Sequence, residues 1–451
     1  MRLPSTIAAA AASALLLVAQ PNGLPALAAP PTIDATTTLR KGYQAAADGL
    51  FPLADTLLTK SIAEWQKTAQ PADEVSALFK VRSGVRQQQG RNEEALNDLN
   101  EALNLLSSPS AKPGAGEEQR TYLQRARVLA QLQRWKEAEA DYSNAIARLD
   151  QLDAIESTNP FLYSERSAAR SRIGDFQGAA DDALTATVEF KDVGDKLRSL
   201  LASSDAAVAL YGSGEIEEGV ARMKQTFTSY GNKSPATNNP DDIGTLQQLA
   251  RREAELHLAY GAHLYGSGGE LADAKKQWET GCIRLEAFIA DAQQRQADEE
   301  ALRAREARQA ETSGKEVAGT LKAASVEGNL FNSPLIARLN GMDPESPFVT
   351  QRPNSGYIYY QTGEGAAVRR NPGVELARVD GALSCANYRR ADWLKANKPE
   401  WPPALVANVE KYAAAVPQGP IVVPPKGAGL DRSQCSVLLS KPGLGDAVPC
   451  F

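Results

Sequence analysis

The side chains that most often carry enzyme chemistry are few in this sequence, and their spacing keeps them apart. The chain has two histidines, His257 and His263. On one helix with 3.6 residues per turn they would be rotated by about 240° from each other, so we do not expect them to share a metal ion. No serine or cysteine has a histidine at a recognisable catalytic spacing. We therefore predict no catalytic residue, no metal ligand set and no cofactor.

Glycine-rich stretches and carboxylates also lack the context that chemistry requires. Residues 211–214 (Tyr-Gly-Ser-Gly) and 265–269 (Tyr-Gly-Ser-Gly-Gly) fall between two expected helices. A phosphate-binding glycine loop follows a strand, so both stretches are interpreted as turns. The carboxylates are spread over helix exteriors, and no two are paired for acid–base work. We expect a protein without catalytic activity, although an enzyme accessory or catalytic module built after residue 329 stays open as an alternative.

Four cysteines are present: Cys282, Cys385, Cys435 and Cys450. They allow three pairings, and the sequence alone does not choose among them. None belongs to a Cys-x-x-Cys pair, which argues against a redox or zinc motif. In an oxidising compartment two disulfides would form, and Cys282 could hold the downstream chain through Cys385. Free buried thiols are the alternative.

The N-terminus has the features of an export signal. Arg2 precedes an apolar run over residues 7–18, and small residues end the segment at Ala28. This pattern predicts a signal peptide over residues 1–28 that is cleaved after Ala28. A buried N-terminal helix and a retained membrane anchor are the alternatives. No other run of about 20 apolar residues follows, and the net charge of −6 disfavours binding to nucleic acid.

A frame of small residues recurs along the first two thirds of the chain. Between recurrences, apolar residues are spaced by three and four, as in amphipathic helices. The small residues are separated by 41, 43, 41, 40 and 55 positions. A large side chain there would hold two paired helices apart. The residues are Ala54, Ala95, Ala138, Ala179, Gly219 and Ala274.

This frame resembles the tetratricopeptide repeat, whose plain period is 34 residues. The unit around Ala138 fits well, with small or aromatic residues at the expected places: Tyr122, Ala126, Ala138, Tyr142 and Ala145. The resemblance covers residues 34–290, or about six units. It implies an all-α fold, a right-handed superhelical solenoid of helical hairpins. The prolines after residue 329 predict that an irregular, Pro-rich C-terminal extension follows it.

The resemblance also implies that the first helix of each hairpin lines a concave groove, where a protein or peptide segment would bind. The carboxylate clamp of some family members is not expected, because Gly84 and Gln124 replace asparagine and Glu165 replaces a basic residue. A C-terminal extension folded into the groove is the alternative occupant. The candidate partner-binding residues are Lys80, Gln87, Arg127, Phe161, Arg172, Tyr211, Tyr260 and His263.

After the repeats we expect a charged helical extension and linker over residues 291–328, then a Pro-rich extension over residues 329–451. Residues 357–360 (Tyr-Ile-Tyr-Tyr) fit either a short strand or an aromatic patch. Trp401-Pro402-Pro403 stops one element and starts the next, because proline favours the first turn of a helix. The following helix, near residues 403–415, is expected to cap the last hairpin, since solenoids need a terminal cap.

The pattern Cys385…Tyr388…Asp392-Trp393-Leu394…Trp401-Pro402-Pro403 resembles the C-terminal end of tetratricopeptide proteins from cyanobacteria and plastids. Residues 159–164 (Asn-Pro-Phe-Leu-Tyr-Ser) are similar to the same group. The resemblance implies a non-catalytic scaffold in the thylakoid lumen or chloroplast that assembles or maintains a membrane complex. A periplasmic or secretory location, peripheral membrane association and a structural repeat protein with a self-occupied groove stay open.

Overall fold

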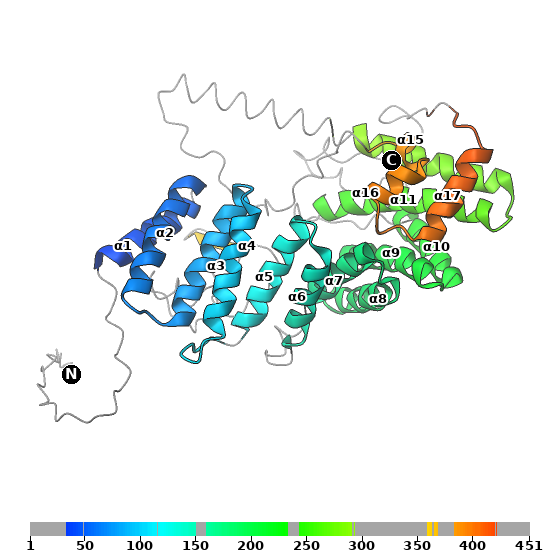
Figure 1. Cartoon of the computed structure of the whole chain (residues 1–451). Coiled ribbons are helices and arrows are strands. Elements are labelled where there is room, and N and C mark those ends of the chain that lie inside the picture. Colours follow the sequence, from blue (N-terminus) through cyan, green and yellow to red (C-terminus); the bar gives the residue numbers. More distant parts are fainter. Residues whose placement is uncertain are drawn as a thin grey trace, which may run out of the picture.

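The structure, a computed structural model, describes residues 33–47, 49–114, 116–149, 159–232, 243–290, 293, 359–362, 365–368, 383–419 and 421. Its N-terminal and central part is a row of helices, each packed on the next (Figure 1). The helices are α1 (Ile33–Ala47), α2 (Phe51–Lys67), α3 (Ala72–Gln88), α4 (Asn92–Leu106), α5 (Glu117–Gln131), α6 (Trp135–Ile146), α7 (Pro160–Ile173), α8 (Phe176–Asp192), α9 (Lys196–Ser213), α10 (Ile216–Asn232), α11 (Ile243–Gly266) and a helix at residues 271–290.

These helices pair into six hairpins, so the described repeats form the all-α solenoid that the sequence predicts. The five alanines of the small-residue frame are completely buried, as helix-to-helix contact requires: Ala54, Ala95, Ala138, Ala179 and Ala274. A large residue at any of these places would push the two helices of a hairpin apart.

The last two hairpins approach even more closely than alanine allows. A Cβ atom added to Gly219 would lie 2.8 Å from the carbonyl oxygen of Ala207, and one added to Gly281 would lie 2.8 Å from that of Ala254. Gly219 looks like a degenerate position in the sequence, since alanine is usual there. In the structure it is instead the residue that lets α10 contact the backbone of α9.

Turns between helices follow ordinary local rules. Gly174 and Gly214 end α7 and α9 with φ of +84° and +101°, a left-handed conformation that glycine adopts without strain. Asp175 begins α8 by accepting a hydrogen bond from the backbone N–H of Gly178, and Asp195 begins α9 in the same way through Arg198. The turns between these helices are therefore specified by signals that lie close together in the sequence.

We call residues 383–419 the C-terminal segment. It contains α15 (Cys385–Tyr388), α16 (Ala391–Asn397) and α17 (Pro403–Ala415), and α17 packs on α11. Figure 1 shows these helices lying against the last hairpin, far from α1. Pro403 is the first residue of α17, in the stretch proposed as a capping helix. Leu405, Val409 and Tyr412 are buried on one side of α17, in the same core cluster as Trp278.

A small β-hairpin is the described exception to the helical fold. β1 (Tyr359–Thr362) pairs antiparallel with β2 (Gly365–Val368), with Tyr359 opposite Val368. Of the two alternatives for residues 357–360, the structure therefore has a strand, beginning at Tyr359. Among the residues described above, no helix combines the length and the apolar character needed to cross a membrane.

Several predictions fall on residues outside the described ranges. They are the export signal at residues 1–28, nearly all of the charged extension at residues 291–328, and Cys435 and Cys450.

Candidate interaction face

The first helices of consecutive hairpins touch one another along one side, which we call the first-helix face. It comprises the contacting sides of α3, α5, α7, α9 and α11. Lys80 of α3 pairs with Glu117 of α5, and Gln124 donates to the carbonyl oxygen of Lys80 at 3.2 Å. Arg127 of α5 then pairs with Glu165 of α7, with a nitrogen–oxygen distance of 2.8 Å.

In the N-terminal part of this face, the predicted cations already have acidic partners. Burial alone would raise the pKa of Glu117, but the positive charges of Lys80 and Arg120 outweigh it and lower that pKa. Glu165, which replaces a basic residue of the carboxylate clamp, binds Arg127 through both of its oxygens. Gln87 donates to the hydroxyl of Ser83 at 3.3 Å.

Phe161 and Arg172 occupy the two ends of α7. The ring of Phe161 meets that of Phe190 edge-on at 5.1 Å, and the guanidinium of Arg198 lies 5.5 Å from the centre of Phe161. At the other end, Arg172 lies over the ring of Trp135 at 4.8 Å. Both residues therefore contribute to packing between hairpins as well as to the face.

The three remaining predicted residues, Tyr211, Tyr260 and His263, form an aromatic row over α9 and α11. The hydroxyl of Tyr211 lies 3.2 Å from Nδ1 of His263, and Tyr260 stacks on His263 with a centroid distance of 6.3 Å. Burial and the nearby charge of Lys224 lower the pKa of His263. Asn408 of α17 donates to the hydroxyl of Tyr211 at 2.9 Å, so the C-terminal segment reaches this row.

Beneath the C-terminal segment lies a buried carboxylate, Glu255 of α11. It accepts hydrogen bonds from Lys398 and from the hydroxyl of Tyr388, both at 2.5 Å. Arg251 and Arg252 of the same helix lie 3.0 Å from its oxygens. Burial alone would raise the pKa of Glu255, but these positive charges, above all that of Lys398, lower it well below its ordinary value.

The same carboxylate belongs to a longer row of alternating charges that joins three first helices. Glu400 lies 3.6 Å from Lys398 and 3.1 Å from Arg172, which connects the segment to α7. Arg252 lies 2.7 Å from Asp205, which connects α11 to α9. In order, the row is Arg172, Glu400, Lys398, Glu255, Arg252 and Asp205.

A disulfide between Cys282 and Cys385 holds the C-terminal segment covalently on the helix at residues 271–290. Both cysteines are buried, and the backbone N–H of Cys385 donates to Glu286 at 2.7 Å. The bond closes a loop of 103 residues. This is the pair suggested in the sequence analysis, and it belongs to one of the three possible pairings of the four cysteines.

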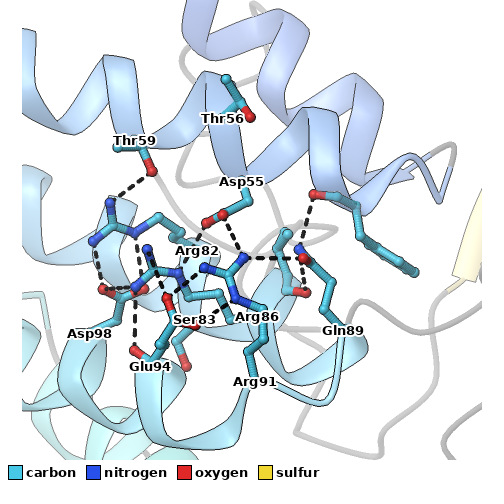
Figure 2. Close-up of polar contacts among 12 residues, drawn as sticks. Asp55, Thr56, Thr59, Arg82, Ser83, Arg86, Gln89, Arg91, Glu94 and Asp98 are labelled. Atoms are coloured by element: carbon cyan, nitrogen blue, oxygen red, sulfur yellow. Dashed lines mark hydrogen bonds and ion pairs between the residues drawn. The ribbon is translucent and has the colours of Figure 1, made fainter.

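Sequence reasoning missed a second set of residues, in which arginines of α3, α5 and α7 bind aspartates of α4, α6 and α8. These residues also link each hairpin to the one before it. In Figure 2, Arg82 of α3 binds Asp98 of α4 through two nitrogens, at 3.0 and 2.6 Å, and donates to Thr59 of α2 at 3.0 Å. Arg86 binds Asp55 of α2 and Asp98, both at 3.0 Å. One arginine thus joins the two helices of its own hairpin to the hairpin before it.

The next two hairpins repeat this arrangement, which we call the arginine clasp. Arg125 binds Asp141 and reaches back to Asn100, while Arg166 binds Asp182 and reaches back to Ser143. Each arginine also lies over an aromatic ring three residues earlier in the chain: Phe79, Tyr122 and Tyr163.

A signal for the clasp is present in the sequence. The three arginines precede their aspartates by 16 residues and recur at intervals of 43 and 41, the same intervals as Ala95, Ala138 and Ala179. In each clasp, two nitrogens of one guanidinium donate hydrogen bonds to the two oxygens of a nearly buried carboxylate. It therefore fixes how neighbouring hairpins stack, and it is a structural rather than a partner-binding element.

The described residues of the first-helix face make hydrogen bonds, ion pairs and aromatic contacts. No three His, Cys, Asp or Glu side chains within those ranges are grouped so that they could hold a metal ion.

Comparison with known proteins gives no family. No protein-family model matches the chain, and no curated protein matches it. Among solved structures, it is similar to a signal-transduction ATPase with a tetratricopeptide repeat sensor from Pyrococcus horikoshii, with 12% identity over 54% of this chain and a TM-score of 0.41. This chain spans 36% of the length of that ATPase.

Two further structures are similar at the same low level. BtubC from P. vanneervenii has 13% identity over 57% of this chain and 89% of its own length, with a TM-score of 0.36. A Rap protein complexed with competence and sporulation factor has 12% identity over 69% of this chain and 76% of its own, with a TM-score of 0.32. The architecture of this chain therefore rests on its own helix pairs.

Proposed function

We propose that this protein is a non-catalytic interaction scaffold, which binds a protein or peptide partner on the first-helix face of α3, α5 and α7. The α9–α11 part of the same face holds the C-terminal segment. Binding energy would come from paired charges and from aromatic anchors such as Phe161, as in other protein interfaces.

The observation that carries this proposal is the way the C-terminal segment sits on the face. An irregular stretch and a helix of this chain dock there through a buried lysine, a tryptophan and a row of apolar residues. A helix lying in an apolar and charged groove is a common mode of peptide recognition. The α9–α11 part of the face is thus chemically suited to hold a polypeptide, and the N-terminal part carries charged and aromatic side chains for a partner: Lys80, Arg127 and Phe161.

The proposed location is an exported one, and the thylakoid lumen is the finer proposal. The signal-like residues 1–28 and the disulfide between Cys282 and Cys385 support export, because such bonds persist in oxidising compartments. Support for the lumen, and for a role in assembling a membrane complex there, comes from the resemblance around residues 385–406 and at residues 159–164. N-terminal sequencing of the mature protein and fractionation of the source cells test both statements.

A charge swap tests the binding face without removing an ion pair. Replacing Arg127→Glu together with Glu165→Arg keeps the pair between α5 and α7 but reverses the charges that a partner meets. The matched control swaps Arg222 and Glu218, an exposed pair on α10 whose atoms lie 3.0 Å apart. Cross-linking and affinity purification of the tagged full-length chain from its native extract provide the readout.

We expect the parent chain and the α10 swap to recover the same stoichiometric polypeptide, and the α5–α7 swap to lose at least nine tenths of it. Equal recovery by all three chains would place the binding surface elsewhere. If the parent chain recovers no polypeptide in stoichiometric amount, the scaffold proposal is wrong.

A further inference from the structure

The hairpins of a solenoid contact only their neighbours, so its bend accumulates from one joint to the next. The described repeats follow this rule: the arginine clasps and the contacts of the first-helix face join adjacent hairpins. The C-terminal segment breaks it. This segment is fixed to the last hairpin, yet it also touches the fourth and the fifth.

Three kinds of contact fix the segment to the last hairpin. The disulfide joins Cys385 to Cys282, and Lys398 and Tyr388 both bind Glu255. The ring of Tyr412 packs on that of Trp278 at 4.8 Å. These contacts lie in a dry core and involve α11 and the helix at residues 271–290 only.

Two other contacts extend from the same segment toward the N-terminus. Asn408 donates to Tyr211 on α9, and Glu400 pairs with Arg172 on α7. The side chain of Glu400 is 13% exposed and that of Arg172 is 33% exposed, so solvent screens this pair in part. The fourth hairpin is thereby connected to the sixth through a segment that begins 191 residues after the end of the fourth and 93 residues after residue 290 of the sixth.

We propose that residues 398–408 are a strap that fixes the angle between the fourth and the last hairpin. The strap holds the α7–α11 part of the solenoid at one curvature, and its release through Arg172 lets the last hairpin turn relative to α7. The strap concerns the shape of this chain and needs no partner. Its failure would therefore leave the proposed scaffold function untouched.

Distance measurements on the full-length chain test the strap. Spin labels attached through non-cysteine chemistry at the exposed Lys191 of α8 and Lys276 of the last hairpin report the separation of the two hairpins by double electron–electron resonance. Two variants each remove the ion pair between the C-terminal segment and α7: Glu400→Gln changes the residue of the segment, and Arg172→Gln changes the residue of α7. Asp392→Asn, in an exposed pair within the same segment, is the matched control.

We expect a narrow distance distribution in the parent and in Asp392→Asn, and a distribution that is at least twice as broad or shifted by several ångströms in both Glu400→Gln and Arg172→Gln. Hydrogen exchange over residues 403–415 should stay unchanged in Arg172→Gln, which shows that the segment remains docked. Unchanged distances in both variants overturn the strap. A change in Glu400→Gln alone also overturns it, because Arg172→Gln removes the same ion pair and should have the same effect.

Discussion

The second to fourth hairpins and the last two hairpins use the same helical frame but are held together in different ways. In α3 to α8, an arginine stands 13 residues before the key alanine and an aspartate three residues after it, and they form the clasp. In the fifth hairpin these places hold Ala206 and Arg222, and in the sixth they hold Gly261 and Gln277. Small residues replace the arginine of the clasp in both hairpins, and the two helices of each hairpin approach more closely.

This difference shifts the source of stability. A clasp is local, since its partners lie within 25 residues along the chain. The last hairpin instead depends on the C-terminal segment, whose Lys398 binds Glu255 across 143 residues and whose Asn408 binds Tyr211 across 197. The clasped hairpins can therefore assemble in chain order, whereas the end of the solenoid is complete only when the segment returns to it.

The largest effect that would sharpen this comparison is expected at Trp278. Its side chain is 3% exposed and packs against Tyr412, so both the last hairpin and α17 depend on it. Trp278→Ala should lower the free energy of unfolding by about 3–5 kcal/mol, the usual cost of a large-to-small change in a core. Urea denaturation measures this loss. Trp393→Ala is the control, at a half-buried position of the C-terminal segment, and it should cost clearly less. A loss under about 1 kcal/mol for Trp278→Ala would contradict the packing described here.

The next effect concerns the buried ion pair of the last hairpin. Lys398→Met leaves Glu255 buried with its closest cation removed, and breaking such a pair from one side costs about 3 kcal/mol or somewhat more. The double variant Lys398→Met with Glu255→Gln removes both charges, and the amide oxygen can still accept from Tyr388 and the two arginines, so it should recover part of that loss. Denaturation midpoints of the two variants decide the matter. If the double variant is no more stable than the single one, the loss does not come from an unpaired charge.

A clasp should contribute less than the buried pair of the last hairpin, because its arginine is partly exposed. Arg125→Lys keeps the charge but loses the fork that meets Asp141, and it should cost about 1.5–3 kcal/mol, the range for hydrogen bonds to charged groups. The comparable change Arg134→Lys affects an exposed pair with Glu137 and serves as the control. A clasp variant that is as stable as this control would mean that hairpins α3 to α8 stack through their alanines alone.

The two regions also differ in how far sequence could predict them. Small residues that recur at intervals of 40 to 55 positions predict the helix pairs, because a small buried residue lets the two helices of a hairpin come into contact. The clasp could have been predicted as well, since its arginines and aspartates share the interval of Ala95, Ala138 and Ala179. The residues that bind the C-terminal segment, such as Glu255 and Tyr211, do not recur at any such interval in the sequence. Tyr211 fits a partner-binding residue in the sequence, yet it is 3% exposed and holds Asn408, a contact that only the folded chain brings about.

The last effect concerns the titration of Glu255, whose contribution to stability is complete near neutral pH and is lost in acid. Its pKa in the folded protein lies below the ordinary value of 4.5, since Lys398 and two arginines outweigh its burial. Between the folded and the ordinary pKa the unfolded chain binds more protons, so stability rises with pH across that window. The contribution of Glu255 is therefore complete above about pH 4.5 and is lost as the pH falls further below that value.

Glu255→Gln isolates this effect, because the amide does not titrate while the other ionisable groups of the network remain. They include Asp205, whose pKa is raised by burial despite Arg252, and which therefore acts in the opposite direction in acid. We expect the stability difference between parent and variant to be constant from pH 5 to 7 and to shrink steadily below pH 4.5 in urea denaturation. A difference that stays constant down to pH 2.5 would mean that the carboxylate of Glu255 has no depressed pKa. The last hairpin would then lack the ionic anchor that distinguishes it from the clasped hairpins.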